Sequence, residues 1–132
     1  MAKQQINTDR VPPPVGHYSQ AIATPANGRM VFVSGMTARR ADGTLAGIGD
    51  IEAQTRQVCE NIKAALEAAG ASMDDVCRID VHLRSIGDRQ RFNKVRAEYW
   101  KTAPPASTLV EVAKLASPEY LVEITAFAVT SG

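Results

Sequence analysis

Residues 121–129, with the sequence LVEITAFAV, constrain the fold more than any other segment, because every residue except Glu123 is apolar or β-branched. In a strand, neighbouring side chains point to opposite faces of the sheet. One face of this strand would carry Val122, Ile124, Ala126 and Ala128, and the other would carry Leu121, Phe127 and Val129. A strand that is apolar on both faces needs cover on both sides. The sequence therefore predicts helices on one face of the sheet and an oligomer contact on the other.

Two helices are predicted to supply the cover on the first face. Apolar residues recur at helical spacing over residues 51–70, where Asp50 is suited to cap the helix and Gly70 to end it. A second helix is expected over residues 89–100, with Asp88 as its cap. Both helices should pack on the same face of one sheet, because only two helical segments lie among the strands.

The strands are predicted at five places. Residues 17–24 and 28–35 flank a turn-forming PANG segment, so they are expected to pair as a hairpin. Further strands are expected over residues 77–86, 107–115 and 121–129. With the two helices they make one mixed sheet in a two-layer α+β fold, and the chain of 132 residues forms a single domain, 1–132.

Composition argues against several classes of function. The net charge is +1 and the fifteen Lys and Arg are scattered, so a nucleic-acid partner is not expected. No run approaches the ~18 apolar residues of a membrane span, and the N-terminus lacks the apolar core of a signal peptide, so we expect a cytoplasmic protein. Two cysteines fit a reducing compartment, and no His or Cys spacing indicates a metal site.

Glu123 is the residue that fits its surroundings least well. A carboxylate among apolar side chains must find partners or keep its proton. It could be an edge or subunit-contact group paired to a Lys, an Arg or a backbone amide, or it could act as a general base that orients water. Spacing alone does not separate these interpretations. His82, on the polar face of its strand, is expected to be solvated or interfacial rather than catalytic.

Other candidates each have a structural and a functional interpretation. Tyr18 could donate to a ligand or fill the core, and Ser34 with Gly35 could cradle a ligand or make a turn. Arg39 and Arg40 follow that Ser-Gly pair in the segment SGMTARR. They could be surface residues of a loop, or one of them could bind a substrate carboxylate.

Six blocks of sequence resemble the RidA/YjgF family of reactive-intermediate deaminases. In chain order they are GHYSQA, VSGMT, AQTRQVCENIKAALEAAGASMDDV, FNKVRAEYW, PPASTLVEVAKL and LVEITAFAV. The resemblance implies a chorismate-mutase-like fold assembled as a homotrimer, with the sheets as an inner barrel and the helices outside. It also implies small-molecule sites in clefts between subunits, where enamines and imines are hydrolysed to a ketone and ammonia without a cofactor.

The resemblance assigns roles to individual residues. Tyr18 is similar to the family's cleft tyrosine, Ser34 and Gly35 to its Ser-Gly pair, and Asn93 to its helix asparagine. Glu123 is similar to the acidic residue associated with the catalytic water. These residues are therefore expected to form one site.

One position departs from the pattern of the family's main branch. Ser107 stands where that branch carries an arginine that grips the substrate carboxylate, and Leu109 replaces a neighbouring cysteine. Losing such a charge-assisted contact costs roughly 2 to 5 kcal/mol of binding, so 2-imino acids are expected to be poor substrates. Ser107 instead suits a neutral or differently shaped ligand, unless Arg39 or Arg40 replaces the missing guanidinium.

Three functional hypotheses follow from the sequence. The first is a hydrolase that acts on a C=N or enamine bond, with Glu123 activating water and with Tyr18 and Ser34 orienting the substrate. The succession SG, RR and DGT is similar to the branch that includes 2-aminomuconate deaminases, which makes an aromatic-degradation intermediate one candidate substrate. The second is a trimeric binding or regulatory module that kept the cleft without catalysis. The third, an endoribonuclease or translation inhibitor, fits the near-neutral charge least well.

Overall fold

The computed structural model of the chain describes residues 3–130. The strands are β1 (Gln4–Ile6), β2 (Ala21–Ala23), β3 (Met30–Met36), β4 (Val76–Leu83), β5 (Ala106–Glu111) and β6 (Val122–Val129). The α-helices are α1 (Ile51–Ala68) and α2 (Arg89–Tyr99), and two short 3-10 helices, η1 (Met73–Asp75) and η2 (Ile86–Asp88), precede β4 and α2. All the predicted helices and strands are present, although several strands are shorter than expected.

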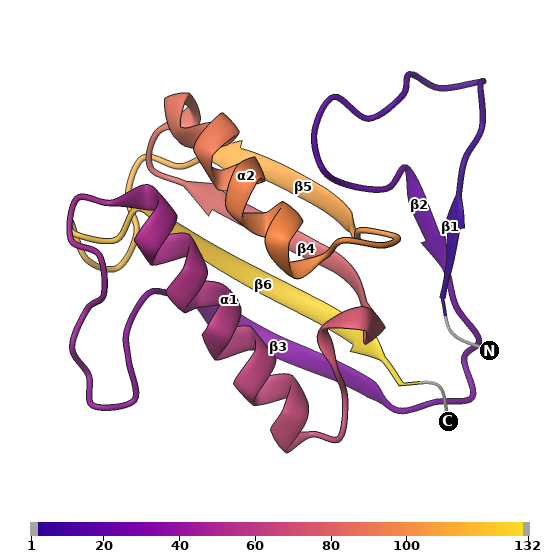
Figure 1. Cartoon of the computed structure of the whole chain (residues 1–132), viewed down its shortest axis with the longest axis horizontal. Coiled ribbons are helices and arrows are strands. Elements are labelled where there is room, and N and C mark those ends of the chain that lie inside the picture. Colours follow the sequence, from indigo (N-terminus) through magenta and orange to yellow (C-terminus); the bar gives the residue numbers. More distant parts are fainter. Residues whose placement is uncertain (1–2, 131–132) are drawn as a thin grey trace.

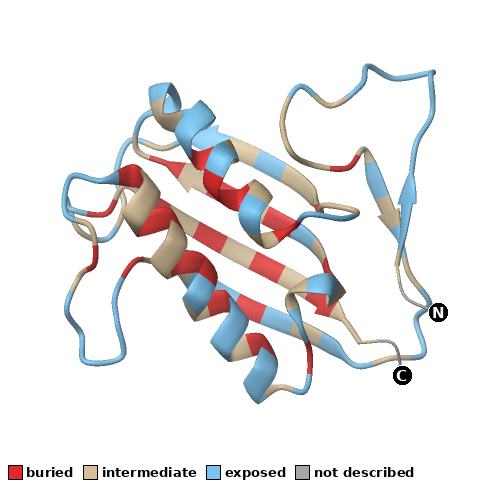
Figure 2. Cartoon of the chain, in the orientation of Figure 1, coloured by how far each residue is buried: buried red, intermediate tan, exposed pale blue. Residues whose placement is uncertain are grey.

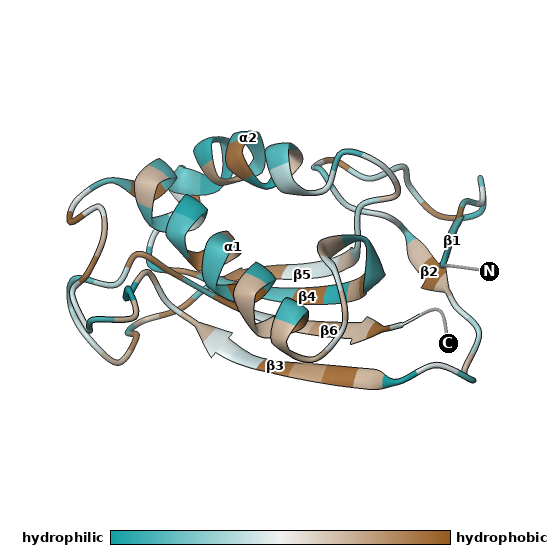
Figure 3. Cartoon of the chain, turned by 60° about the horizontal axis from the view of Figure 1, so that its bottom comes forward, coloured by the Kyte–Doolittle hydropathy of each residue, from teal (hydrophilic) through white to brown (hydrophobic). Residues whose placement is uncertain are grey.

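The main sheet has the strand order β3-β6-β4-β5, in which β4 and β5 run parallel and the other pairs are antiparallel. Both α-helices lie on one face of this sheet, side by side, as Figures 1 and 3 show from two directions. The two-layer α+β fold with a mixed sheet and both helices on one face is therefore confirmed.

Strand β6 lies between β3 and β4, and its two faces differ as its sequence predicts. Val122, Ile124, Ala126 and Ala128 are at most 2% exposed beneath the helices, whereas the alternate residues are half-buried. The alternation is visible along β6 in Figure 2. The strand is the centre of the sheet, so its helix-side row forms the middle of the hydrophobic core.

The predicted hairpin of residues 17–24 and 28–35 is wrong. Strand β2 pairs instead with β1, as Ile6 opposite Ala21 through Gln4 opposite Ala23, and forms a separate two-stranded ribbon. Strand β3 pairs with β6, from Met30 opposite Val129 onward. The long strand β6 offers β3 a longer ladder and an aromatic partner for Phe32 in Phe127, and a three-residue β2 offers far less, so the distant pairing replaces the local one.

Helix α1 follows its sequence signals closely. The Asp50 carboxylate accepts a hydrogen bond from the amide of Ala53 (3.1 Å), and Gly70 follows the helix end with φ +79°, a conformation suited to glycine. Cys59 is fully buried on this helix, and desolvation raises the pKa of its thiol to about 12, so it is a protonated core residue. In contrast, the Asp88 side chain makes no cap hydrogen bond to α2.

The sheet face opposite the helices is partly apolar and uncovered in the single chain. Met30 and Phe32 are each 66% exposed, and the Phe32 ring packs edge-on against Phe127 with centroids 5.8 Å apart. Figure 3 shows the strongly hydrophobic stretch of β3 at the side of the sheet away from the helices. Within residues 3–130, no helix combines the length and the apolar character needed to cross a bilayer.

Candidate functional site

A cavity of about 190 Å³ lies between α2, β5 and the segment that leads into β2. Three residues that the sequence singled out, Tyr18, Asn93 and Ser107, line it together. Leu109 also lines the cavity. The cavity lies on the helix side of the sheet, because Ser107 is opposite Ile79, which is fully buried beneath the helices.

Tyr18 is positioned by backbone contacts of its own segment. Its amide donates to the carbonyl of Gly16 (3.1 Å), and the amide of Ser19 donates to the carbonyl of Pro105 (3.1 Å), just before β5. A side chain at Gly16 would be 3.3 Å from Asn93 Nδ2 and 3.5 Å from the Tyr18 ring. The absence of a side chain at Gly16 therefore lets the lead-in segment approach Asn93 closely.

The sequence reasoning missed Arg96, a second polar residue of α2 at this cavity. Arg96 is 3% exposed, and its Nε donates to Asn93 Oδ1 (2.8 Å) while its Nη1 donates to Ser107 Oγ (3.0 Å). Its guanidinium lies 5.0 Å from the ring centroid of Phe92 and 5.9 Å from that of Tyr18. Desolvation lowers its pKa to about 10, so the group stays charged at neutral pH.

A polar stripe on α2 could have revealed Arg96. Arg89, Asn93 and Arg96 recur at the spacing i, i+4 and i+7, which places them on one side of a helix, and all three line the cavity. A guanidinium therefore reaches the cavity beside Ser107, and it comes from α2 rather than from β5.

Glu123 lies in a different place, on the uncovered face of the sheet. It is opposite His82 across β4 and β6 and is half-buried. Within residues 3–130 its carboxylate makes no hydrogen bond or ion pair, whereas Nδ1 of the neighbouring His82 is buried without a partner. Glu123 is therefore not enclosed in the core, and nothing in the described part of the chain neutralises it.

The Ser-Gly pair lies directly beside this carboxylate. A β-carbon on Gly35 would be 2.4 Å from Glu123 Oε2 and 2.9 Å from its Cδ, so the carboxylate occupies the space that any side chain at position 35 would need. Ser34 and Gly35 are both exposed in the irregular part of the β3-β6 pairing, between Val33 and Met36. The structure thus groups Ser34, Gly35 and Glu123 into a second cluster.

Gln54, also missed from the sequence, fixes the start of the strand that carries Glu123. It is fully buried on α1, its Nε2 donates to the carbonyl of Glu119 (2.9 Å), and its Oε1 accepts from the amide of Leu121 (2.9 Å). Two bonds from one rigid helix hold the chain just before β6. This anchoring sets the position of Glu123 two residues later.

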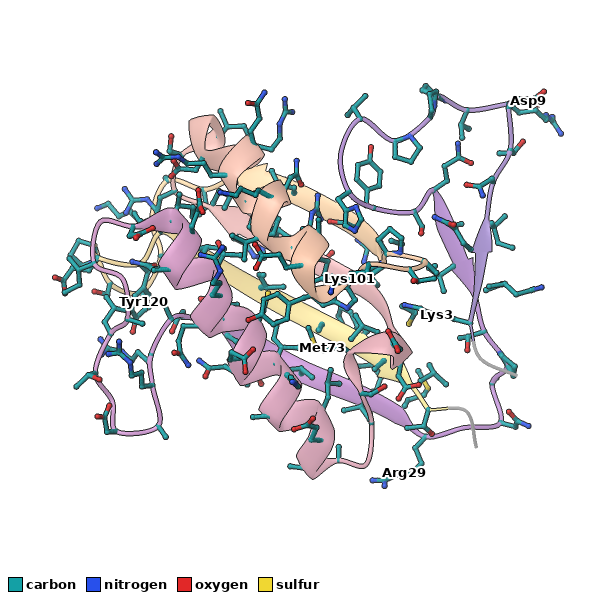
Figure 4. The ribbon with its side chains drawn as sticks, viewed as in Figure 1. Lys3, Asp9, Arg29, Met73, Lys101 and Tyr120 are labelled. Atoms are coloured by element: carbon teal, nitrogen blue, oxygen red, sulfur yellow. The ribbon has the colours of Figure 1, made fainter. Side chains whose placement is uncertain are left out.

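Arg39 and Arg40 do not line the cavity. They lie in the loop between β3 and α1, where the Arg39 guanidinium donates to the Tyr120 hydroxyl and to the carbonyl of Gly43 (2.6 Å), and Arg40 donates to Thr44 Oγ1 (3.2 Å). Tyr120 lies at the end of the molecule opposite the N-terminal ribbon and Lys3 (Figure 4). Within one chain, these two arginines are occupied by their own loop and its neighbour.

The sequence model of a family described as Endoribonuclease L-PSP matches residues 8–130. A RutC family protein of Pyrococcus abyssi is 41% identical over 128 residues, 97% of this chain and 98% of that protein. The chain belongs to this family, the RidA/YjgF family.

Two further members are informative. A protein of Acinetobacter baylyi named 3-aminoacrylate deaminase RutC is 38% identical over 128 residues, which cover 97% of this chain and 98% of that protein. A solved structure from Yersinia pestis, described as a protein of unknown function of the conserved Rid protein family, superposes with a TM-score of 0.88 at 34% identity, covering 98% of this chain and all of that one. The RidA-like chain therefore shares its whole fold with family members.

Proposed function

We propose that this chain is a hydrolase that converts a small enamine or imine into a ketone and ammonia, with Glu123 as the group that activates water. The observation that carries the proposal is the Glu123 carboxylate, which has no partner within residues 3–130 and lies against Gly35 on an accessible face. The name of the Acinetobacter relative, a deaminase of the enamine 3-aminoacrylate, supports the same chemistry.

The proposed reaction balances with water and protein groups alone, and it includes no cofactor or metal. An enamine first takes a proton on carbon and loses one from nitrogen to become the imine. Glu123 accepts a proton from water as the oxygen bonds to the imine carbon, and that proton passes to nitrogen to give the carbinolamine. The carbinolamine hydroxyl then loses its proton to Glu123, which passes it to nitrogen, so that ammonia leaves as the C–N bond breaks and the C=O bond forms. Tyr18, Ser34 and Asn93 orient the substrate, and backbone amides near Ser107 to Leu109 hold its polar end.

The site is proposed to form between subunits of a homotrimer. The cavity with Tyr18 and Asn93 lies on the helix side of the sheet, and Glu123 lies on the opposite face, so one chain does not unite them. Met30, Phe32 and Phe127 provide an apolar surface on the Glu123 face that a second copy would cover. A trimer with such clefts would bring the two clusters of residues together.

The location and the partners follow the same proposal. A cytoplasmic enzyme acting on a small molecule fits the near-neutral charge, and neither a nucleic acid nor a membrane is a proposed partner. The substrate preference is proposed to differ from that of the family's main branch, because Ser107 replaces the arginine of the strand.

The alternative function is a trimeric small-molecule-binding or regulatory module without catalysis. The specific observation in its favour is that the Ser107 hydroxyl accepts a hydrogen bond from Arg96. Ser107 is therefore engaged with the protein, whereas an arginine at this position would contact the substrate directly. Endoribonuclease activity, which the family description names, is a weaker alternative because the net charge is only +1.

An assay of turnover separates these functions. We expect the wild-type protein to accelerate ammonia release from 2-aminoacrylate or 2-iminobutanoate generated in situ, above the spontaneous rate. A neutral imine should be assayed in parallel. Because Ser107 replaces the arginine of the main branch, this comparison measures whether the protein prefers a substrate with or without a carboxylate. No acceleration with any imine or enamine would contradict the hydrolase and leave the binding module.

Gly35→Ala is expected to lower this activity by about 10²-fold, because the new methyl group would displace the Glu123 carboxylate and a misplacement of about 1 Å is costly in catalysis. The carboxylate is the far end of a flexible side chain, so the melting temperature should change little. Gly87→Ala is the matched control, since a β-carbon there would come no closer than 3.4 Å to its nearest neighbour, Ser85 Oγ. Unchanged kcat/KM in Gly35→Ala would show that the contact with Glu123 has no catalytic importance.

A further inference from the structure

Arg96 is a buried charge without a counter-ion. It is 3% exposed, yet the ion pairs of residues 3–130 join Arg56, Arg78 and Lys94 to carboxylates and do not include Arg96. No Asp or Glu lines the cavity, which carries Arg89 as a second cation. The acidic groups that interact electrostatically with Arg96 are the Tyr18 phenol and the Cys59 thiol. Burial keeps that thiol protonated, so it does not act as a counter-ion.

A buried guanidinium without a carboxylate is costly unless something compensates it. The protein supplies two neutral acceptors, Asn93 Oδ1 and Ser107 Oγ, and two aromatic rings beside the planar group. These contacts hold the guanidinium in one orientation but do not neutralise it. Arg96 Nη2 makes no hydrogen bond within the described residues, so this edge of the group is available to a ligand that enters the cavity.

We propose that Arg96 is the residue that binds the carboxylate of the ligand, from α2, in place of the arginine that the main branch carries at the position of Ser107. Asn93 and Ser107 are positioning residues that hold the guanidinium. The inference rests on the proposed function only where it concerns turnover, because Arg96 would bind a carboxylate whether or not the protein catalyses the reaction. It deepens that function by naming the residue of this chain that recognises the carboxylate of the substrate.

The geometry explains why the ligand must be small and anionic. The cavity of about 190 Å³ is smaller than those that hold drug-sized ligands. The Arg96 fork matches the two oxygens of a carboxylate, and the exposed Arg89 at the same cavity would favour the approach of an anion. A shift of the guanidinium from strand to helix keeps the charge and changes its position. The requirement for a carboxylate therefore remains, while the preferred shape of the substrate differs from that of the main branch.

The experiment measures binding apart from turnover. 2-Oxobutanoate, a stable carboxylate with the shape of the product, is titrated into the wild-type protein by calorimetry, with butan-2-one as the uncharged control. We expect the wild type to bind the carboxylate and not the neutral ketone. Arg96→Gln should weaken this binding by roughly 30-fold or more, and Arg96→Lys should weaken it less, because lysine keeps the charge but loses the fork.

Three further variants make the result specific. Arg91→Gln, an exposed arginine of the same helix that does not line the cavity, should leave binding within about twofold. Ser107→Asp keeps Arg96 but places a carboxylate next to its guanidinium, so it should abolish binding of 2-oxobutanoate even if Arg96→Gln does not fold. Arg96→Gln combined with Ser107→Arg returns the guanidinium to β5 and should restore binding.

The possible outcomes separate this inference from the proposed function. Lost carboxylate binding in Arg96→Gln and Ser107→Asp, with no turnover by the wild type, supports Arg96 and refutes the hydrolase. Turnover by the wild type, with a KM for 2-iminobutanoate that Arg96→Gln and Ser107→Asp leave unchanged, overturns the inference and keeps the hydrolase. Equal binding of 2-oxobutanoate and butan-2-one by the wild type also overturns it.

Discussion

Glu123→Gln is expected to lower kcat for imine hydrolysis by about 10² to 10⁴-fold, because the amide cannot accept the proton of the attacking water. KM should change little, since the proposed substrate contacts are on Tyr18, Asn93 and Arg96. Ammonia release under single-turnover conditions is the measurement. Glu67→Gln, which changes an exposed carboxylate of α1, is the matched control and should retain full activity.

The stability of Glu123→Gln gives an independent check. The carboxylate makes no hydrogen bond or ion pair within residues 3–130, so its replacement by an amide of the same shape should leave the melting temperature unchanged or slightly raised. A variant that keeps its fold and loses its activity would assign the carboxylate to catalysis. Activity within a few-fold of the wild type would exclude Glu123 as the base.

The helices and the central strand could be predicted from the sequence because their signals are local. Asp50 and Gly70 mark the ends of α1 by their own hydrogen bonding and backbone conformation, and Asp50 caps the helix as expected. The alternation in residues 121–129 separates the two side-chain rows of β6 without any knowledge of its neighbours, and the structure shows which row is buried. Such signals depend on the chain within a few residues.

Strand partners could not be predicted in the same way. The segment that contains β2 has a turn before β3, and the local sequence therefore favours a hairpin. The actual partner of β3 is β6, in the last part of the chain, which β3 joins through Phe32 opposite Phe127. The choice is made by how much apolar surface two strands bury together, and no short window of sequence contains both of them.

The candidate site shows the same limit in its electrostatics. Taken alone, Ser107 indicates a cavity that lacks the guanidinium of the family's arginine. In the sequence, Arg39 and Arg40 are the arginines nearest to the Ser-Gly pair that could replace it. The structure places Arg96 there instead, because the i, i+4, i+7 stripe of α2 packs over β5. A residue type missing from one element can be supplied by another, and only the packing of the two elements reveals it.

Phe32→Glu is expected to dissociate the proposed trimer and to abolish turnover. Phe32 is 66% exposed in one chain and packs on Phe127, in the middle of the apolar surface that a second copy would cover. In the trimer, a glutamate at the centre of a dry contact would be desolvated without a partner, which costs several kcal/mol. In the single chain the same position is exposed to water and tolerates the charge. The fold of the chain should therefore survive the substitution. Light scattering coupled to size-exclusion chromatography measures the assembly, and circular dichroism measures the fold.

The control and the contrary outcome follow from the same geometry. Ile48 is 65% exposed in the loop before α1, so Ile48→Glu adds the same charge to another exposed apolar residue and should leave assembly and activity intact. If Phe32→Glu stays trimeric, the uncovered sheet face is not the subunit contact. If it becomes monomeric and remains fully active, then Glu123 and the Arg96 cavity do not need two chains to act together, and the inter-subunit site is wrong even though the trimer is right. Loss of both properties in one variant would tie the exposed face of β3 to catalysis that takes place across the interface.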